Sequence, residues 1–102
     1  MKEVLLLITT VANEEIARNI SKSLIKKKLA ACISMKTINS IYKWGDDIEE
    51  TKEIEITIKS KPELIDDLIL ALQQMTSYEI PQILHKKFNS ESKYLDWLNN
   101  TI

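Results

Sequence analysis

The charged side chains best placed for chemistry lie in the segment Glu53-Ile54-Glu55-Ile56-Thr57-Ile58-Lys59, where polar and apolar residues alternate strictly. This alternation has the period of a strand with one buried face, so Glu53 and Lys59 share a face with Glu55 and Thr57. Such a face is either solvated or internally paired, or, in an oligomer, it lines a cleft between subunits. Both interpretations stay open at this point.

The soft metal donors are few, because Cys32 is the only cysteine and His85 the only histidine. Cys32 follows two alanines at the expected start of a strand, where a small buried hydrophobe is favoured over a ligand. His85 stands beside Lys86 and Lys87, and metal sites need several converging donors, so a surface role is favoured. Cys32 is therefore the one candidate metal ligand that we single out, as a thiolate for a soft ion such as cuprous copper.

Four large aromatic residues could stack on a ligand: Tyr42, Trp44, Tyr94 and Trp97. Aromatic residues on a long hairpin and on a terminal helix more often anchor an interface between subunits. We therefore predict that these four residues contact other subunits.

The elements that position these residues centre on a hairpin. Two strand-like runs flank Gly45, the only glycine of the chain, which is followed by Asp46. This composition suits a turn with positive φ, so the sequence predicts a long antiparallel hairpin.

Before the hairpin, Val4 to Thr10 is an apolar run without alternation, which is typical of a central strand buried on both faces. Asn13 can cap a following helix that extends to Lys28, with Glu14 and Glu15 favourable at the positive end of its dipole.

After the hairpin, Ser60-Lys61-Pro62-Glu63 has the spacing of a capping box in front of a second helix. The segment Tyr78 to Phe88 is predicted as a strand, and Pro81 within it indicates an edge strand or the first residues of a strand. Residues Ser92 to Thr101 are predicted to form a short helix.

The order of strand, helix, hairpin, helix, strand and short helix predicts an α+β, ferredoxin-like βαββαβ fold in a single domain, residues 1–102. The predicted sheet is antiparallel and consists of Val4–Thr10, Ala31–Tyr42, Ile48–Lys59 and about Ile80–Lys87. Helices Glu14–Lys28 and Pro62–Met75 are expected on the same face. Because the first strand is apolar on both faces, something must cover the open face, and another copy of the chain is the simplest cover.

Composition narrows the function classes. Fourteen basic and fifteen acidic residues argue against a nucleic-acid partner, and the apolar run near the N-terminus is too short for a membrane span or a signal segment. A single cysteine fits a reducing compartment, so a cytoplasmic protein is expected.

Successive motifs of the chain resemble those of the CutA proteins, the divalent-cation tolerance family. They are Leu29-Ala30-Ala31-Cys32, Ser40-Ile41-Tyr42-Lys43-Trp44, Glu53 with Ile58-Lys59, Tyr78-Glu79-Ile80-Pro81 and Tyr94-Leu95-Asp96-Trp97. The resemblance runs from Val4 to Leu98, and it implies a ferredoxin-like subunit in a tight homotrimer whose long hairpin reaches onto a neighbour.

One family motif departs from its usual form. The pattern His-Pro-Tyr-x-x-Pro-Glu is here Thr76-Ser77-Tyr78-Glu79-Ile80-Pro81-Gln82, so the imidazole and the second carboxylate are replaced by Thr76 and Gln82. The expected intersubunit cleft thus comprises Glu53, Lys59, Tyr78, Glu79, Thr76 and Gln82. A neutral hydroxyl or amide is a poor donor, so divalent copper or zinc should bind only weakly.

The resemblance implies a non-catalytic protein of divalent metal ion, chiefly copper, tolerance or response, with no required cofactor. The alternative is a trimeric small-molecule-binding, scaffold or signalling module without a physiological metal. An enzyme or an RNA-binding domain on this fold ranks last. The only arginine, Arg18, lies in a predicted helix rather than a tight loop, and the central strand carries Glu53, Glu55 and Thr57 where an RNA-binding sheet needs aromatics.

Overall fold

The computed structural model describes residues 2–102 and follows the predicted order of elements. In chain order they are β1 (Glu3–Val11), α1 (Glu14–Lys26), β2 (Cys32–Trp44), β3 (Asp47–Ser60), the 3-10 turn η1 (Pro62–Leu64), α2 (Ile65–Met75), β4 (Ile83–Asn89) and α3 (Ser92–Thr101). The strands form one antiparallel sheet in the order β2-β3-β1-β4. The predicted ferredoxin-like α+β fold is confirmed.

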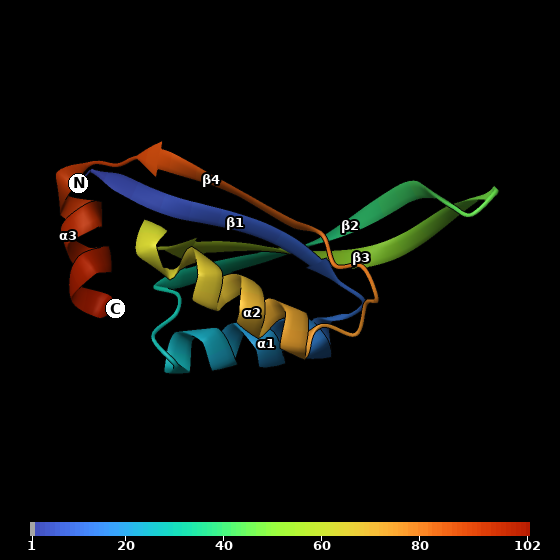
Figure 1. Ribbon diagram of the computed structural model, residues 1–102, viewed down its shortest axis with the longest axis horizontal. Helices are drawn as coiled ribbons and strands as arrows, with labels where there is room; N and C mark the ends of the chain where they lie inside the picture. Colours follow the sequence, from blue (N-terminus) through green and yellow to red (C-terminus); the bar gives the residue numbers. More distant parts are fainter. Residues whose placement is uncertain (1) are drawn as a thin grey trace.

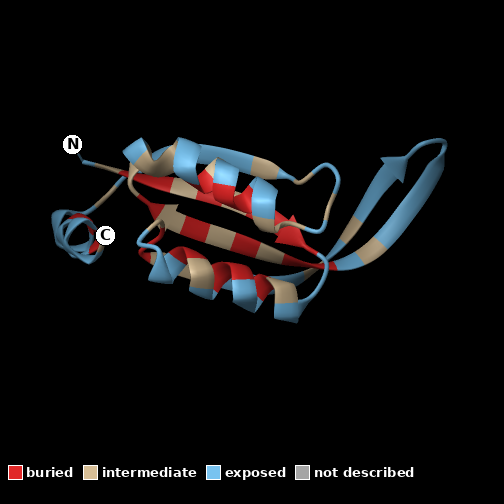
Figure 2. Cartoon of the chain, turned by 60° about the horizontal axis from the view of Figure 1, so that its bottom comes forward, coloured by how far each residue is buried: buried red, intermediate tan, exposed pale blue. Residues whose placement is uncertain are grey.

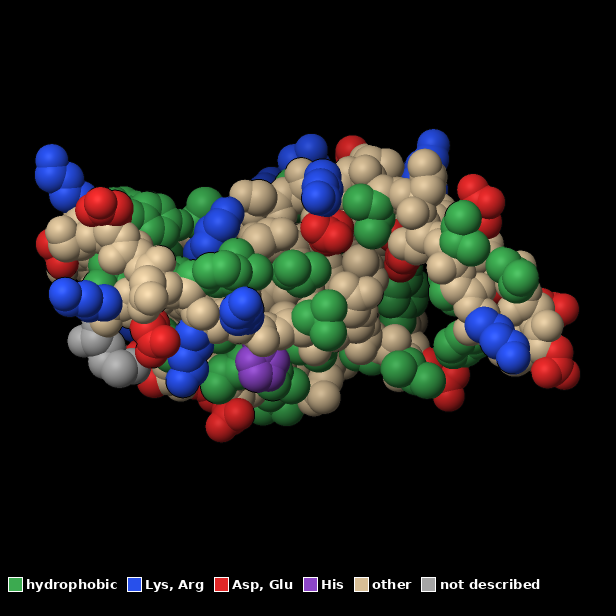
Figure 3. Space-filling model, turned by 90° about the horizontal axis from the view of Figure 1, so that it is seen from above, with side chains coloured by type: hydrophobic (Ala, Val, Ile, Leu, Met, Phe, Trp, Pro, Cys, Tyr) green, Lys and Arg blue, Asp and Glu red, His purple; other side chains and the backbone are tan. Residues whose placement is uncertain are grey.

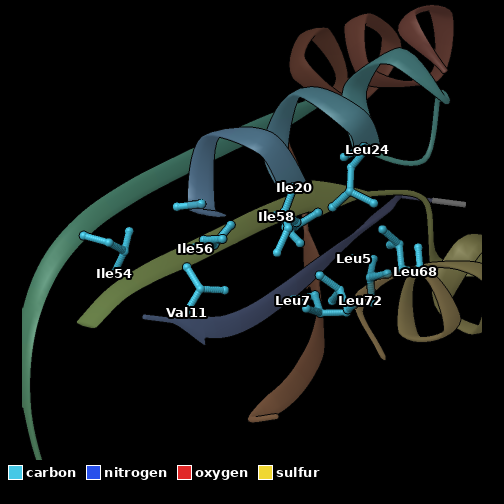
Figure 4. Close-up of a cluster of buried hydrophobic side chains, with 13 residues drawn as sticks. Leu5, Leu7, Val11, Ile20, Leu24, Ile54, Ile56, Ile58, Leu68 and Leu72 are labelled. Carbon is cyan, nitrogen blue, oxygen red and sulfur yellow. The ribbon is translucent and has the colours of Figure 1, made fainter. Parts of the chain in front are cut away.

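The hydrophobic core lies between the sheet and one layer of two helices. Helices α1 and α2 lie side by side on one face, as predicted, and leave the opposite face uncovered (Figure 1). The core side chains come from β1, β3 and the two helices (Figure 4). β1 is a central strand and contributes Leu5, Leu7 and Val11 to this core.

The ends of α1 show how local sequence sets the first helix. The Oδ1 atom of Asn13 accepts the backbone N–H of Ile16 at 2.9 Å, which is the predicted N-cap. The helix ends two residues before the predicted Lys28, which instead has a φ of 60°. The N–H groups of Lys28 and Leu29 bond to the carbonyls of Ile25 and Leu24, which is a Schellman end with lysine where glycine is usual.

The predicted capping box at Ser60 is wrong. Ser60 is the last residue of β3 and fully buried, and its hydroxyl donates to the Leu29 carbonyl at 2.6 Å. That hydroxyl is therefore not available to cap the second helix. The predicted helix Pro62–Met75 is instead η1 followed by α2, and Lys61 precedes η1 with no side-chain cap.

The last strand begins later than predicted. β4 starts at Ile83, so Tyr78, Ile80 and Pro81 lie in the loop 76–82 that joins α2 to β4. The N–H of Tyr78 bonds to the side chain of Thr76 rather than to a strand, and Pro81 has no N–H to donate. β4 is an edge strand, as the proline indicated.

The predicted hairpin is confirmed, with Gly45 at a φ of 63° in its turn. β1 ends at Val11, which pairs with Ile54, so residues 38–53 of the hairpin pair only with each other. We call residues 38–53 the arm. The arm projects from the body of the sheet, and most of its residues are exposed (Figure 2).

The sheet face opposite α1 and α2 is only partly covered. α3 packs at the end of the sheet remote from the arm, with Leu95 and Leu98 against Val4 and Ala31. Elsewhere on this face hydrophobic side chains lie between charged ones (Figure 3). In residues 2–102 no helix has the length and apolar character needed to cross a membrane.

Candidate functional site

A hollow that can hold a ligand lies where the arm leaves the body of the sheet. It has a volume of about 650 Å³ and opens between the arm and the loop 76–82. Its lining is Thr10, Ser40, Ile41, Tyr42, Trp44, Glu49, Glu53, Ser77, Tyr78, Glu79, Ile80 and Gln82. We call this hollow the arm cleft.

A hydrogen bond joins the arm to the loop 76–82 within the lining of the arm cleft. The Tyr78 hydroxyl donates to Oε2 of Glu53 at 2.6 Å, and Glu53 is only 9% exposed. Burial of Tyr78 and its bond to the Glu53 carboxylate raise the pKa of the phenol well above its usual range. Tyr78 therefore stays protonated and remains a donor to Glu53.

The position of Tyr78 is set by local sequence. The Oγ1 atom of Thr76, at the C-terminal end of α2, accepts the backbone N–H of Tyr78 at 3.1 Å. This contact forms a short turn just beyond α2, and the Tyr78 hydroxyl reaches Glu53 on the arm. Thr76 itself does not line the arm cleft.

The structure brings together some of the residues predicted for one cleft and separates others. Glu53, Tyr78, Glu79 and Gln82 line the arm cleft, while Lys59 and Thr76 do not. Glu53 and Lys59 do share a sheet face, but six residues of extended strand separate them by roughly 20 Å. The Lys59 ammonium donates instead to the Ser34 hydroxyl at 2.9 Å.

The candidate metal ligand lies at the far end of the sheet. Cys32 is half-buried and pairs with Lys59 across β2 and β3, next to α3. Burial and the neighbouring Cys32 sulfur raise the pKa of Tyr94. His85 is exposed on the edge strand β4. Cys32 and His85 thus lie apart from the arm cleft.

The four predicted interface aromatics divide into two pairs. Tyr42 and Trp44 lie on the arm, are 41% and 54% exposed, and line the arm cleft. Tyr94 and Trp97 lie on α3, with ring centroids 5.6 Å apart and exposures of 39% and 47%. Their contact with other subunits stays a prediction.

Sequence reasoning missed Glu49, which lines the arm cleft as Glu53 does. A signal for it was present: with Gly45-Asp46 as a two-residue turn, Trp44 pairs with Asp47 and Tyr42 with Glu49. Glu49 therefore had to share the face of Tyr42. The contribution of Ser77 and Ile80 from the loop had no comparable signal.

In the described part of the chain, the metal-binding side chains of Cys32 and His85 do not meet. Within residues 2–102, no three side chains among His, Cys, Asp and Glu converge closely enough to hold an ion. Cys32 lies on β2 and His85 on β4, both apart from the glutamates of the arm cleft, and zinc or copper sites need three or four ligands around one centre.

Comparison with known proteins places the chain in a family. The family model described as CutA1 divalent ion tolerance protein matches residues 5–101. The divalent-cation tolerance protein CutA of Thermus thermophilus is 33% identical over 100 residues, which cover 96% of this chain and 95% of that protein. The chain spans about half of the chloroplastic CutA of Arabidopsis thaliana, with 30% identity over 52% of that protein.

Solved structures that superpose on this chain belong to the same family. CutA from Synechococcus elongatus superposes with a TM-score of 0.94 at 31% identity, covering 99% of this chain and 91% of that one. The protein from Archaeoglobus fulgidus described as periplasmic divalent cation tolerance protein CutA has a TM-score of 0.93 at 29% identity, covering 96% and 97% of the two chains. From its sequence motifs, its fold and these similarities, the chain belongs to the CutA1 divalent ion tolerance protein family.

Proposed function

We propose that this protein is a non-catalytic homotrimer that serves tolerance of, or response to, divalent metal ions, chiefly copper, in the cytoplasm. The observation that carries the proposal is family membership across residues 5–101, together with an arm that its own chain leaves uncovered. No required cofactor, nucleic acid or membrane is part of this function.

The uncovered arm supports the assembly. An isolated two-stranded ribbon is marginally stable in water, yet this arm carries exposed Ile41, Trp44 and Ile48. Large apolar side chains on a projecting ribbon are stabilised when a partner covers them. Further copies of the same chain are the partners that the family resemblance implies. In a closed ring of three copies, every arm has a partner to cover it.

The residues at the family motif positions support only weak binding of divalent copper or zinc. Thr76 and Gln82 replace the imidazole and carboxylate of the family motif, and Thr76 already accepts a hydrogen bond from Tyr78. Imidazole is the commonest protein ligand for these ions. This protein therefore binds them less tightly than relatives that carry the full motif.

Calorimetry with cupric and zinc ions tests this part of the proposal. The double variant Thr76→His with Gln82→Glu should bind at least about tenfold more tightly than the wild type, because it restores an imidazole and a carboxylate. The matched control is Asn99→His with Gln73→Glu, which adds the same groups at exposed positions outside the motif. Equal affinity in the wild type and the motif variant, or nanomolar binding by the wild type, would show that the metal site lies elsewhere.

A second candidate function is a trimeric binding or scaffold module without a physiological metal. The observation that favours it is the arm cleft itself, whose volume of about 650 Å³ suits a small organic molecule. This candidate predicts a bound organic ligand and no metal in protein purified without chelator.

A further inference from the structure

One side-chain contact joins the base of the arm to the body of the same chain. The Tyr78 hydroxyl, from the loop 76–82, donates to Oε2 of Glu53 at 2.6 Å. From Glu53 toward the tip, the two strands of the arm pair only with each other, and the arm projects from the sheet (Figure 2). Among residues 2–102, no other side-chain hydrogen bond or ion pair links the arm to the body. A change at this contact therefore acts on the direction of the whole arm.

The loop side of this contact is itself fixed to the core. The backbone N–H of Tyr78 donates to Oγ1 of Thr76 at 3.1 Å, and the N–H of Thr76 donates to the Leu72 carbonyl at 2.9 Å. Leu72 belongs to α2 and is 2% exposed in the core. A chain of three hydrogen bonds thus leads from the core through Thr76 and Tyr78 to Glu53.

The contact joins two parts of one chain, so it does not depend on which surfaces the assembly covers. Glu53 is 9% exposed in a single subunit, and a neighbour that covers the arm can only lower this fraction. A buried carboxylate that loses its donor is costly, so the bond is favoured in free and assembled subunits alike. A two-stranded ribbon is only marginally stable by itself, so without this bond the arm would take several directions.

We propose that Tyr78 and Thr76 are positioning residues for assembly, which hold the arm of the free subunit in the direction that its neighbour requires. This inference rests on the proposed homotrimer and is independent of metal binding. Association weakens in proportion to the fraction of subunits whose binding conformation is already formed, and a preformed arm avoids the cost of ordering it. In a ring of three, each chain contributes one arm, so the effect counts three times.

Assembly kinetics test the inference. Unfolded protein is diluted from urea at a series of chain concentrations, light scattering follows the rise in mass, and circular dichroism follows folding of the chain. Tyr78→Phe should lower the second-order association rate constant by at least about fivefold, because the lost bond to a charged group no longer holds the arm. The matched control is Tyr94→Phe, which removes a phenol hydroxyl without a hydrogen bond in residues 2–102 and should change the constant by less than about twofold.

A pair of variants at Thr76 makes the test independent of how well Tyr78→Phe folds. Thr76→Ser keeps the acceptor for the Tyr78 N–H and should assemble at the wild-type rate. Thr76→Val has the same shape without the acceptor and should assemble at least about threefold more slowly. A role in stability alone would change the concentration-independent folding phase and leave the association rate constant at its wild-type value.

The outcomes separate this inference from the homotrimer on which it rests. A wild type without a concentration-dependent rise in mass would contradict the homotrimer and this inference together. A wild type that assembles, with Tyr78→Phe and Thr76→Val assembling at the same rate, would overturn the inference and leave the homotrimer standing. Equal slowing by Tyr94→Phe, or by Thr76→Ser and Thr76→Val alike, would also overturn it, because the effect would then not depend on the contact with the arm.

Discussion

The two halves of the hairpin have the same kinds of residue and opposite environments. Ile56 and Ile58 in the body of β3 are 0% exposed, whereas Ile41 and Ile48 on the arm are 69% and 79% exposed. All four lie on the sheet face that bears the helices, but α1 and α2 cover only the body. The alternation along a strand thus shows which face is apolar. Whether that face is buried depends on the elements that cover it. The arm needs a cover from outside its own chain.

The largest expected effect is on the free energy of unfolding, which should depend strongly on a side chain of the body and little on a side chain of the arm. Ile56→Ala removes a fully buried side chain from the core and should lower the free energy of unfolding by about 2–5 kcal/mol. In dissociated subunits Ile48→Ala should change it by less than about 0.5 kcal/mol, because the side chain is exposed there. Denaturant unfolding of both variants under dissociating conditions measures the difference. Equal losses would mean that the arm is packed within its own chain.

The second effect is on the association of the subunits. Trp44→Ala removes a large aromatic side chain from the arm and should weaken subunit association by about 2 kcal/mol or more, as interface anchors do. Lys43→Ala, at the neighbouring position on the other face, is the matched control and should have little effect. Sedimentation velocity over a range of concentrations measures both. An unchanged association constant for Trp44→Ala would show that this residue is no interface anchor.

At the junction between the body and the arm, loss of one hydrogen bond should lower the free energy of unfolding by about 1.5–3 kcal/mol. Tyr78→Phe removes the hydrogen bond to Glu53 and leaves a buried carboxylate without its donor. The pKa of Tyr78 is raised in the folded state, so its contribution is complete below the unfolded value of about 10 and is lost as pH rises above it. Unfolding measured from neutral to alkaline pH should therefore show a fall in stability.

Tyr78→Phe should flatten that alkaline fall, while Tyr42→Phe, on the same cleft but with no hydrogen bond to Glu53 in residues 2–102, should keep most of it. A wild-type profile that is flat above pH 10, or one unchanged by Tyr78→Phe, would contradict the coupling between loop and arm.

The smallest effect compares the turns of the two regions. Gly45 at the tip of the arm and Lys28 at the end of α1 both have positive φ, 63° and 60°. Gly45→Ala should cost about 1 kcal/mol, whereas Lys28→Gly should stabilise the body by up to about 1 kcal/mol, because left-handed backbone disfavours a side chain. Thermal unfolding of the two variants should shift in opposite directions.

Much of the fold was predictable because local signals agreed with the tertiary structure. The Asn13 cap, the turn at Gly45 and the alternation from Glu53 to Lys59 each appear as predicted. The capping box predicted at Ser60 was wrong because its hydroxyl bonds to the carbonyl of Leu29, which is distant in sequence. The start of β4 was misplaced because the pattern around Pro81 does not separate loop from edge strand.

The candidate site was predictable only in part. Family motifs pointed to Glu53, Tyr78, Glu79 and Gln82, and the structure places all four around one cleft. Lys59 lies roughly 20 Å along β3 from Glu53 in the same chain, so its place in a cleft between subunits stays a prediction. The contact between Tyr78 and Glu53 depends on the path of the loop 76–82, which no periodicity specifies.

The central claim is that other copies of this chain cover the arm, and a native mass spectrum of protein purified without chelator tests it most directly. The predicted result is one species at three times the chain mass of 11.8 kDa, with Trp44→Ala shifting it toward single chains. A single-chain mass at micromolar concentration for the wild type would contradict the claim.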